Sequence, residues 1–334
     1  MKEEMCVRFL ILRFGSSREV LLTTPIVRCL KEQVKGAEIH YAVKKAYAPL
    51  LDANPYLHKV HILEDNPGKL VRRLKEEEFD YIIDLQQDFK SQMIRSRLRL
   101  ISFDLSRDYI RKWMMVRLKI NLLPEKHWTE RCLDTVKVFD VVNDNKGLDF
   151  NIRDHEEVKS TQLPQEFRKG FVAFVIGARY QTRKLPSDMI IEICKKINYP
   201  VVLVGGAEDV NQGEIISHEP DCRAWNACGK YTFKQSASLI RQASMVISHD
   251  TVMMHVATAY RQRLISIWGN TIPGFGMAPY MPHKDSRIFE AKGLRCRPCS
   301  DKGYRTCPKK HFQCMRNINL KELVQHGRDI LASI

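Results

Sequence analysis

Asp250 and Thr251 are the residues of this chain best placed to bind a phosphate group. They follow a short apolar run, residues 245–248, and precede a helical pattern, so they mark the start of a helix. Free amides and the positive end of the helix dipole attract anions at such a place. The alternative interpretation is that both residues only cap the helix.

Two further strand-to-helix segments offer groups that suit a nucleotide. Residues 177–186 contain Thr182 and Arg183, whose hydroxyl and guanidinium groups can donate to a diphosphate. Gly205 and Gly206 precede Glu208, a carboxylate that could bind ribose hydroxyls. A basic surface loop and an ordinary tight turn are the alternatives for these two segments.

A carboxylate stands in the first strand-to-helix turn of the chain. Glu19 ends the polar segment 15–19, which follows an expected strand at residues 6–14. A carboxylate there could remove the proton from an acceptor hydroxyl as a general base. Stabilisation of the helix dipole alone is the alternative explanation.

Four cysteines lie close together near the C-terminus. Cys296, Cys299, Cys307 and Cys314 form one C-x-x-C pair and two further thiols, a spacing that allows a structural zinc site without requiring one. Reduced, packed thiols and a labile disulfide are the alternatives. We expect no catalytic cofactor and no catalytic metal.

The elements that must position these residues alternate between short apolar strands and helical patterns. Strands are expected at 6–14, 38–43, 59–63, 81–85, 171–176, 201–204, 245–248 and 264–268, and helices at 20–34, 47–52, 69–77, 186–197 and 236–243. This order predicts an α/β protein with two doubly wound parallel-sheet domains facing a cleft, residues 1–160 and 161–334. Neither domain contains G-x-G-x-x-G, so a nicotinamide dehydrogenase is not supported.

Charge narrows the choice of partners. The 334 residues carry a net charge of +15, which suits nucleic acid, an anionic membrane or a phosphorylated substrate. Lys90 to Lys119 is rich in Lys and Arg, and its few aromatics argue against single-strand stacking. No apolar run approaches the roughly 18 residues of a membrane span, and Arg8 interrupts the first one, so we expect a cytoplasmic protein.

Several motifs, taken in order along the chain, resemble those of glycosyltransferase family 9, the lipopolysaccharide heptosyltransferases. They are RFGSSREVLLTTP, YAPLLDANPYLHKV, DYIIDLQ, GARYQTRKLP, LVGGAED, HDTVMMHVATA, SIWGNTIP and CRPC…CPKKHFQCM. NACGKY and SIWGNTIPGFGMAPY are most similar to the Bacteroidetes branch. The resemblance implies a GT-B fold with two Rossmann-like domains. The N-terminal domain is then expected to bind the acceptor. The C-terminal domain is expected to bind the nucleotide sugar and to end in a Cys-rich tail and a final helix.

The resemblance also implies an activity and its partners. The expected reaction is metal-independent, inverting transfer of heptose from ADP-heptose to the inner core of lipopolysaccharide, by a peripheral protein at the anionic inner face of the inner membrane. No nucleic acid is expected. By position in the motifs, Glu19 is the general base, and Arg183, Asp250, Thr251, Val252 and His255 are donor ligands. Thr182 and Glu208 are expected as further donor ligands, and Ser17, Arg18, Lys90 and Arg131 as acceptor ligands.

The chain departs from the family pattern at the site. Arg18 and Glu19 stand where the family has Gly-Asp, Val252 stands where it has Gly, and Leu185 replaces a Trp. The longer Glu side chain moves the carboxylate, and a β-branched Val narrows the approach of a phosphate. One alternative is therefore a catalytically impaired relative that binds a sugar nucleotide or glycan. A basic nucleic-acid-binding protein with a Cys-rich knuckle is the other.

Overall fold

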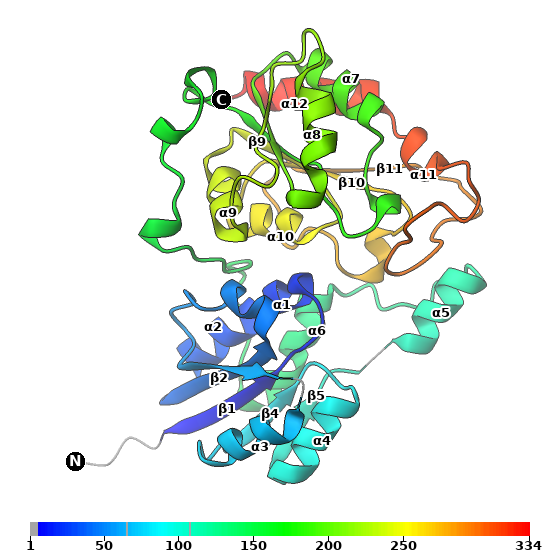
Figure 1. Cartoon of the computed structure of the whole chain (residues 1–334). Helices are drawn as coiled ribbons and strands as arrows, with labels where there is room; N and C mark the ends of the chain where they lie inside the picture. Colours follow the sequence, from blue (N-terminus) through cyan, green and yellow to red (C-terminus); the bar gives the residue numbers. More distant parts are fainter. Residues whose placement is uncertain (1–5, 65, 107) are drawn as a thin grey trace. The chain divides into compact units, whose positions relative to one another are not determined.

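The computed structural model describes residues 6–64, 66–106 and 108–334, and its chain divides into two compact units (Figure 1). Unit 1 comprises Met1–Asp108 and Pro124–Asn151; unit 2 comprises Tyr109–Leu123 and Ile152–Ile334. Both units contain a parallel sheet, as the alternation of strands and helices predicted. Two features were not expected: the chain passes into unit 2 at Ile152, ahead of the expected boundary at residue 160, and Tyr109–Leu123 belongs to unit 2.

Unit 1 is a five-stranded parallel sheet with helices on both faces (Figure 1). Its strands are β1 (Val7–Leu12), β2 (Ala37–Lys44), β3 (Lys59–Leu63), β4 (Tyr81–Asp84) and β5 (Ile101–Asp104), in the order β3-β2-β1-β4-β5. Its helices are α1 (Ser17–Leu22), α2 (Thr24–Gln33), α3 (Pro67–Lys75), α4 (Phe89–Leu98) and α6 (Trp128–Leu133). Leu10 and Leu12 of β1 pack with α3 and α4, whereas Phe9 faces the opposite side against Phe139.

The expected single helix over residues 20–34 is wrong: the structure has α1 and α2 instead. The Thr23 hydroxyl donates to the Val20 carbonyl at 2.7 Å, and Pro25 supplies no amide to continue the ladder. Because of both features α1 ends here, and a new helix, α2, begins with Pro25 in its first turn. The expected helix near residue 47 is likewise a 3₁₀ turn, Lys45–Leu50, which contains Pro49.

Unit 2 is a six-stranded parallel sheet. Its strands are β6 (Val172–Val175), β7 (Val201–Val204), β8 (Ala224–Asn226), β9 (Met245–His249), β10 (Leu264–Trp268) and β11 (Arg287–Glu290), in the order β11-β10-β9-β6-β7-β8. Helices α7 (Ser187–Ile197), α8 (Val210–Ser217) and α12 (Leu320–Ala332) share one apolar core on one face. Helices α9 (Phe233–Gln242) and α10 (Val252–Ala259) pack together, and α10 contacts β9 and β10.

Each sheet has one place where consecutive crossovers turn in opposite directions. In unit 1 the chain goes from β1 outward through β2 and β3, then returns to β4 beside β1. In unit 2 it does the same from β6 to β9. The segments that follow such a strand pair diverge and leave a crevice at the carboxyl edge, where open α/β sheets bind ligands. The β1–β4 and β6–β9 pairs therefore locate the candidate site in each unit.

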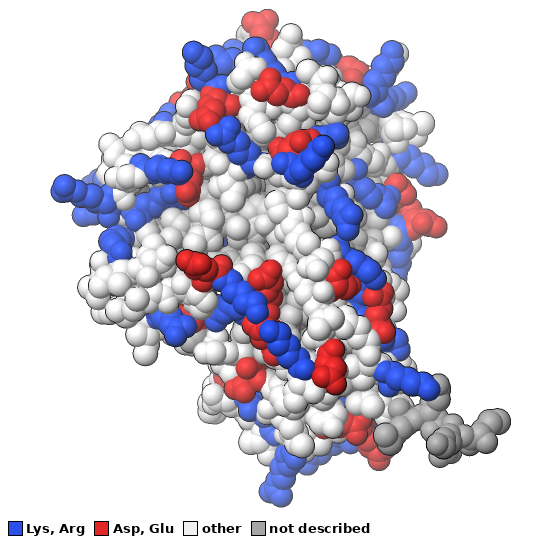
Figure 2. Space-filling view, turned by 180° about the vertical axis from the view of Figure 1, so that it is seen from behind, with Lys and Arg blue, Asp and Glu red and all other residues white. Residues whose placement is uncertain are grey.

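The surface charge is mixed. Figure 2 shows Asp and Glu interspersed with Lys and Arg over one face of the molecule, rather than a field of a single sign. The basic stretch from Lys90 to Lys119 is not one helical face, because it is divided among α4, β5 and α5 (Tyr109–Arg117). No described helix has both the length and the apolar character that crossing a bilayer requires.

Strands β2 and β3 carry a buried pair of histidines. The His40 Nδ1 and His61 Nε2 atoms lie 2.9 Å apart, and both side chains are buried. Burial lowers the pKa of His40 to about 4; burial, followed by the neighbouring His40 charge, lowers that of His61 to about 4 as well. The pair is therefore neutral in the folded protein at neutral pH.

We expect acid to destabilise unit 1 through this pair. Unfolded histidine titrates near pH 6.5, so between about pH 6.5 and about pH 4 the unfolded chain binds more protons. The free energy of unfolding should fall by about 1 to 3 kcal/mol as the pH drops through that window. Urea unfolding at several pH values checks this. His61→Phe should flatten the dependence and His218→Ala, at an exposed histidine, should not; equal slopes in all three proteins would contradict it.

Candidate active site

Arg183 and Asp250 meet at the β6–β9 pair of unit 2. Arg183 comes from the segment after β6, and Asp250 directly follows β9. The Arg183 Nη1 atom lies 3.0 Å from the Asp250 carbonyl oxygen and 3.2 Å from its Oδ2. Both side chains are largely buried, so each charge is stabilised mainly by the other. Two motifs that lie 67 residues apart in the sequence thus form one corner of the site, in which the Arg183 guanidinium is paired with a carboxylate.

The start of α10 lies beside this corner. Thr251 is the N-cap in an extended conformation, and its hydroxyl lies 3.3 Å from that of Ser248 instead of bonding to the helix amides. Val252 is the first helical residue, and it is half-buried, as Thr251 is. The first amides of α10 thus have no side-chain cap and suit an anionic ligand.

Three other expected donor ligands occupy different environments. The Thr182 hydroxyl donates to the Tyr304 carbonyl at 3.1 Å and accepts from the Tyr304 amide at 2.8 Å, so it fastens the Cys-rich loop. His255 is fully buried in α10. Glu208 is exposed on the turn after β7, with its carboxylate folded over Gly206. Of these three, Glu208 alone presents its polar group to solvent.

Sequence reasoning missed a buried ion pair in unit 2. Lys184 and Asp209 form it at the carboxyl edge of β6 and β7, and Asp209 also accepts from the Gly206 amide at 2.9 Å. His249 at the end of β9 accepts from the Leu185 amide at 2.9 Å. Burial, followed by the charge of Lys184, lowers the pKa of His249 to about 3. These contacts fix the loop that carries Arg183.

Close packing at Gly269 holds the same loop against β10. A Cβ atom there would lie 2.6 Å from the Thr182 carbonyl oxygen and 2.5 Å from Met315. We expect Gly269→Ala to lower the free energy of unfolding by about 1 to 3 kcal/mol, because backbone must shift. Urea unfolding measures the change. Gly274→Ala is the matched control, since its Cβ would make only ordinary contact with Ile272 and should cost little; equal losses would contradict the packing argument.

Glu19 lies at the β1–β4 pair of unit 1. It is the third residue of α1, and it forms a capping box with Ser16, whose amide donates to Glu19 Oε2 at 2.7 Å. Arg13, the first residue after β1, places Nη2 2.5 Å from Glu19 Oε1. A side chain at Gly15 would collide with the carboxylate, because its Cβ would lie 2.1 Å from Oε2. The turn therefore holds the carboxylate in one orientation.

The Glu19 carboxylate is firmly ionised. Burial opposes its charge, but the charge and hydrogen bond of Arg13, the charge of Arg18 and the Ser16 amide lower its pKa to about 2. Sequence reasoning did not single out Arg13, which is buried, donates to the Leu85 carbonyl and lies over the Trp128 ring at 5.1 Å. Its place directly after a strand was the available signal.

The expected acceptor ligands are divided among three helices. Ser17 and Arg18 begin α1, and Lys90 is the second residue of α4, which follows β4. Because β1 and β4 are neighbours, both helix starts lie at the same sheet edge. Arg131 on α6 pairs with Asp108 and donates to the Ser106 carbonyl at 3.0 Å, so it braces the segment after β5.

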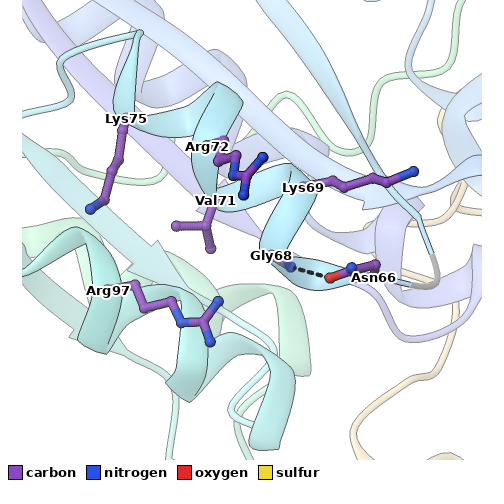
Figure 3. A pocket seen from close by; sticks show the side chains of 7 residues that line it. All are labelled: Asn66, Gly68, Lys69, Val71, Arg72, Lys75 and Arg97. Carbon is purple, nitrogen blue, oxygen red and sulfur yellow. Dashed lines mark hydrogen bonds between the residues drawn. The ribbon is translucent and has the colours of Figure 1, made fainter.

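A groove between α3 and α4 gathers cations that sequence reasoning did not group. Lys69, Arg72 and Lys75 come from α3 and Arg97 comes from α4, and together they line a groove with a volume of about 510 Å³ (Figure 3). Asn66, Gly68 and Val71 complete the lining, so no carboxylate takes part in it. The groove is suited to an anionic group such as a phosphate.

The four C-terminal cysteines converge in space. The Cys296 Sγ atom lies 3.7 Å from His311 Nε2. Burial and then the neighbouring Cys296 raise the pKa of Cys299 to about 11; burial and then the other three thiols raise that of Cys314 to about 12. Within the described chain, no three of their ligand atoms, Cys307 included, lie within 4.8 Å of one another. A structural zinc site therefore remains one alternative for these thiols, beside reduced, packed thiols and a labile disulfide.

Two other groups of candidate metal ligands occur among the described residues. Glu38, His40 and His58 form one, and His40, His61 and Glu77 the other, each with ligand atoms within 4.8 Å of one another. They lie at β2 and β3, away from the β1–β4 pair, and we assign them no part in the reaction.

Two doubly wound α/β units, each with its polar residues at the carboxyl edge of the reversing strand pair, are the architecture of the GT-B class of glycosyltransferases. Residues 68–310 match the model of glycosyltransferase family 9 (heptosyltransferase). The chain belongs to this family.

Individual relatives are distant. The chain is 27% identical to lipooligosaccharide heptosyltransferase 2 of Campylobacter jejuni over 39% of its own length, and it spans 40% of that relative. It is 22% identical to lipopolysaccharide heptosyltransferase 3 of Escherichia coli over 85% of its length and 93% of the relative's. The structure of E. coli ADP-heptose LPS heptosyltransferase II superimposes with a TM-score of 0.75 at 19% identity, covering 98% and 99% of the two chains.

Proposed function

We propose that this protein transfers a heptose from ADP-heptose to the inner core of lipopolysaccharide, with inversion and without a metal. The observation that carries the proposal is the Arg183–Asp250 pair beside the open start of α10, in a chain of family 9. A guanidinium and free helix amides together bind a diphosphate and stabilise the charge that develops on it as it leaves. Because the E. coli protein with the same fold is an ADP-heptose LPS heptosyltransferase, we expect the nucleotide of this protein's donor to be ADP.

The donor is held by unit 2. Arg183 and the α10 amides face the diphosphate, while Asp250 and Thr271 orient the guanidinium, the Thr271 hydroxyl donating to Asp250 Oδ2 at 2.8 Å. Glu208, exposed at the edge of β7, binds ribose hydroxyls. Thr182, fastened to Tyr304, positions the loop rather than the donor.

The acceptor is held by unit 1. Ser17, Arg18 and Lys90 line its sheet edge, and the α3–α4 groove binds phosphate or carboxylate groups of the acceptor core. The acceptor oxygen attacks the anomeric carbon opposite the diphosphate as Glu19 removes its proton; the bond to ADP breaks, and ADP leaves with the electron pair. With a pKa of about 2, Glu19 accepts that proton only as its contact with Arg13 loosens.

The ion pair between Arg13 and Glu19 also favours a second function, binding without catalysis. If Arg13 holds Glu19 throughout, the protein binds a sugar nucleotide or glycan without transferring the sugar. The capping box and the ion pair explain why Glu19 is present without any chemistry. Glu19→Asp combined with Arg18→Gly, which restores the family's pair, would then create activity from none.

The deciding experiment is calorimetric titration with ADP, UDP and GDP in metal-free buffer, followed by transfer assays on lipopolysaccharide cores that lack heptose. Selective ADP binding with transfer supports the heptosyltransferase. ADP binding without transfer supports the non-catalytic relative. Absence of binding at millimolar nucleotide would contradict the heptosyltransferase, would leave glycan binding as the function of the non-catalytic relative, and would mean that Val252 closes the phosphate site.

A further inference from the structure

The segment Tyr109–Leu123 of unit 2 exposes large apolar side chains. It begins with α5, which has no buried residue, and continues without regular structure to Leu123. Its most exposed large apolar side chain is Ile110 at 75%, and five more are roughly half exposed: Tyr109, Trp113, Leu118, Ile120 and Leu122. Single exposed apolar residues are ordinary, but so many in one short segment mark a contact surface.

Two of the three basic side chains of α5 lie apart from its apolar side. At about 100° per residue, Tyr109, Ile110 and Trp113 project within one arc of the helix. Arg111 and Lys112 project outside that arc, whereas Arg117, in the last turn, projects within it. An apolar arc with Trp and Tyr, bordered by cations, is typical of helices that lie in a membrane interface.

The charge of this segment indicates which kind of partner its surface binds. Between Tyr109 and Leu123 the chain contains Arg111, Lys112, Arg117 and Lys119 and no Asp or Glu. Such a segment repels basic surfaces and is attracted to anionic lipid headgroups. The nine residues of α5 extend about 14 Å, far less than a bilayer core of about 30 Å, so it lies along the surface.

The segment is fastened to the donor unit. Lys119 Nζ donates to the carbonyl oxygens of Pro298 at 2.6 Å and Cys296 at 3.3 Å. Arg297, between them, donates to the Thr271 carbonyl at 2.7 Å, and Thr271 is the partner of Asp250. The exposed segment is thereby linked to the loop that supports the phosphate corner.

We propose that Tyr109–Leu123 is a membrane-docking surface. Its apolar side chains enter the headgroup region of an anionic bilayer while its cations contact lipid phosphates. The proposal deepens the proposed function by naming the element that holds the enzyme near a lipid-linked acceptor, although docking itself requires neither substrate.

The test is co-sedimentation of the full-length protein with vesicles of phosphatidylcholine alone or rich in phosphatidylglycerol, without donor or acceptor. We expect wild type to partition at least tenfold more strongly onto the anionic vesicles, and less so as salt rises. Ile110→Ser with Trp113→Ser, and separately Arg111→Glu with Arg117→Glu, should each weaken binding to anionic vesicles by on the order of tenfold.

Two matched controls test whether the segment itself is responsible. Phe89→Ser removes a side chain that is 81% exposed in unit 1, and Lys169→Glu with Lys292→Glu makes the same change in net charge elsewhere. Both should bind as wild type does. Equal losses in the controls, or no binding of wild type at low salt, would overturn the proposal. A dimer that the Ser variant dissociates would also overturn it, because a second copy would then cover the segment.

ADP titration of the same variants separates the two proposals. Docking variants should bind ADP as wild type does. Segment-specific vesicle binding in a protein that binds no nucleotide would leave docking intact while the proposed function fails.

Discussion

Replacing Glu19 by Gln should slow sugar transfer by about 10²- to 10⁴-fold while leaving the affinity for ADP unchanged. Gln is the matched replacement because it can still accept from the Ser16 amide and keep the capping box. What it lacks is the negative charge that accepts the acceptor proton. Single-turnover rates at saturating donor measure the loss, and calorimetry measures ADP affinity, which resides in unit 2.

Stability must be followed in the same variant, because Glu19→Gln leaves the buried Arg13 guanidinium without its carboxylate. A loss of up to about 3 kcal/mol is expected on that ground, and urea unfolding measures it. Glu19→Asp keeps the charge, restores the family's carboxylate and should retain more activity than Gln. Full turnover in Glu19→Gln would show that this residue is only a helix cap and the partner of Arg13.

Replacing Arg183 by Met should weaken ADP binding by about 10²-fold, because a charge-assisted contact with the diphosphate is lost. It should also lower the free energy of unfolding by about 3 kcal/mol, since the Asp250 carboxylate stays buried without its cation. Titration with ADP and urea unfolding give the two quantities separately.

Two further variants separate binding from stability. Arg183→Met with Asp250→Asn removes both charges, so stability should largely return while ADP binding stays weak. Arg179→Met changes an exposed arginine of the same loop and should alter affinity by less than about threefold. If Arg179→Met weakens binding as much as Arg183→Met, general basicity of the loop explains the effect and the assigned corner does not exist.

Several strands that consist mainly of apolar residues were predictable from sequence. Residues 59–63, 201–204 and 264–268 were predicted with the bounds that the structure has for β3, β7 and β10. The strands β5, β8 and β11 were not predicted. They are short, and their side chains are only partly buried, so their sequences lack the apolar runs of central strands.

The site was predictable as a set of segments but not as contacts. The glycines, the apolar-to-polar changes and the family motifs pointed to the loops that carry Glu19, Arg183 and Asp250. They did not indicate that Arg13 would form an ion pair with Glu19, or that the Thr182 hydroxyl would be hydrogen-bonded to the backbone of Tyr304. Both partners depend on which segments become neighbours in space, and no local pattern encodes that.

The sequence by itself determined the alternation of strands and helices, the family and the residue types at the sheet edges, because periodicity and turn chemistry are local properties. Strand order was decided only in the tertiary structure. The return of the chain to β4 beside β1, and to β9 beside β6, creates the two strand pairs at which the crossovers reverse and brings Arg183 to Asp250. Strand pairing joins segments far apart in the chain through the packing of whole helical layers, so it lies beyond the reach of any short stretch of sequence.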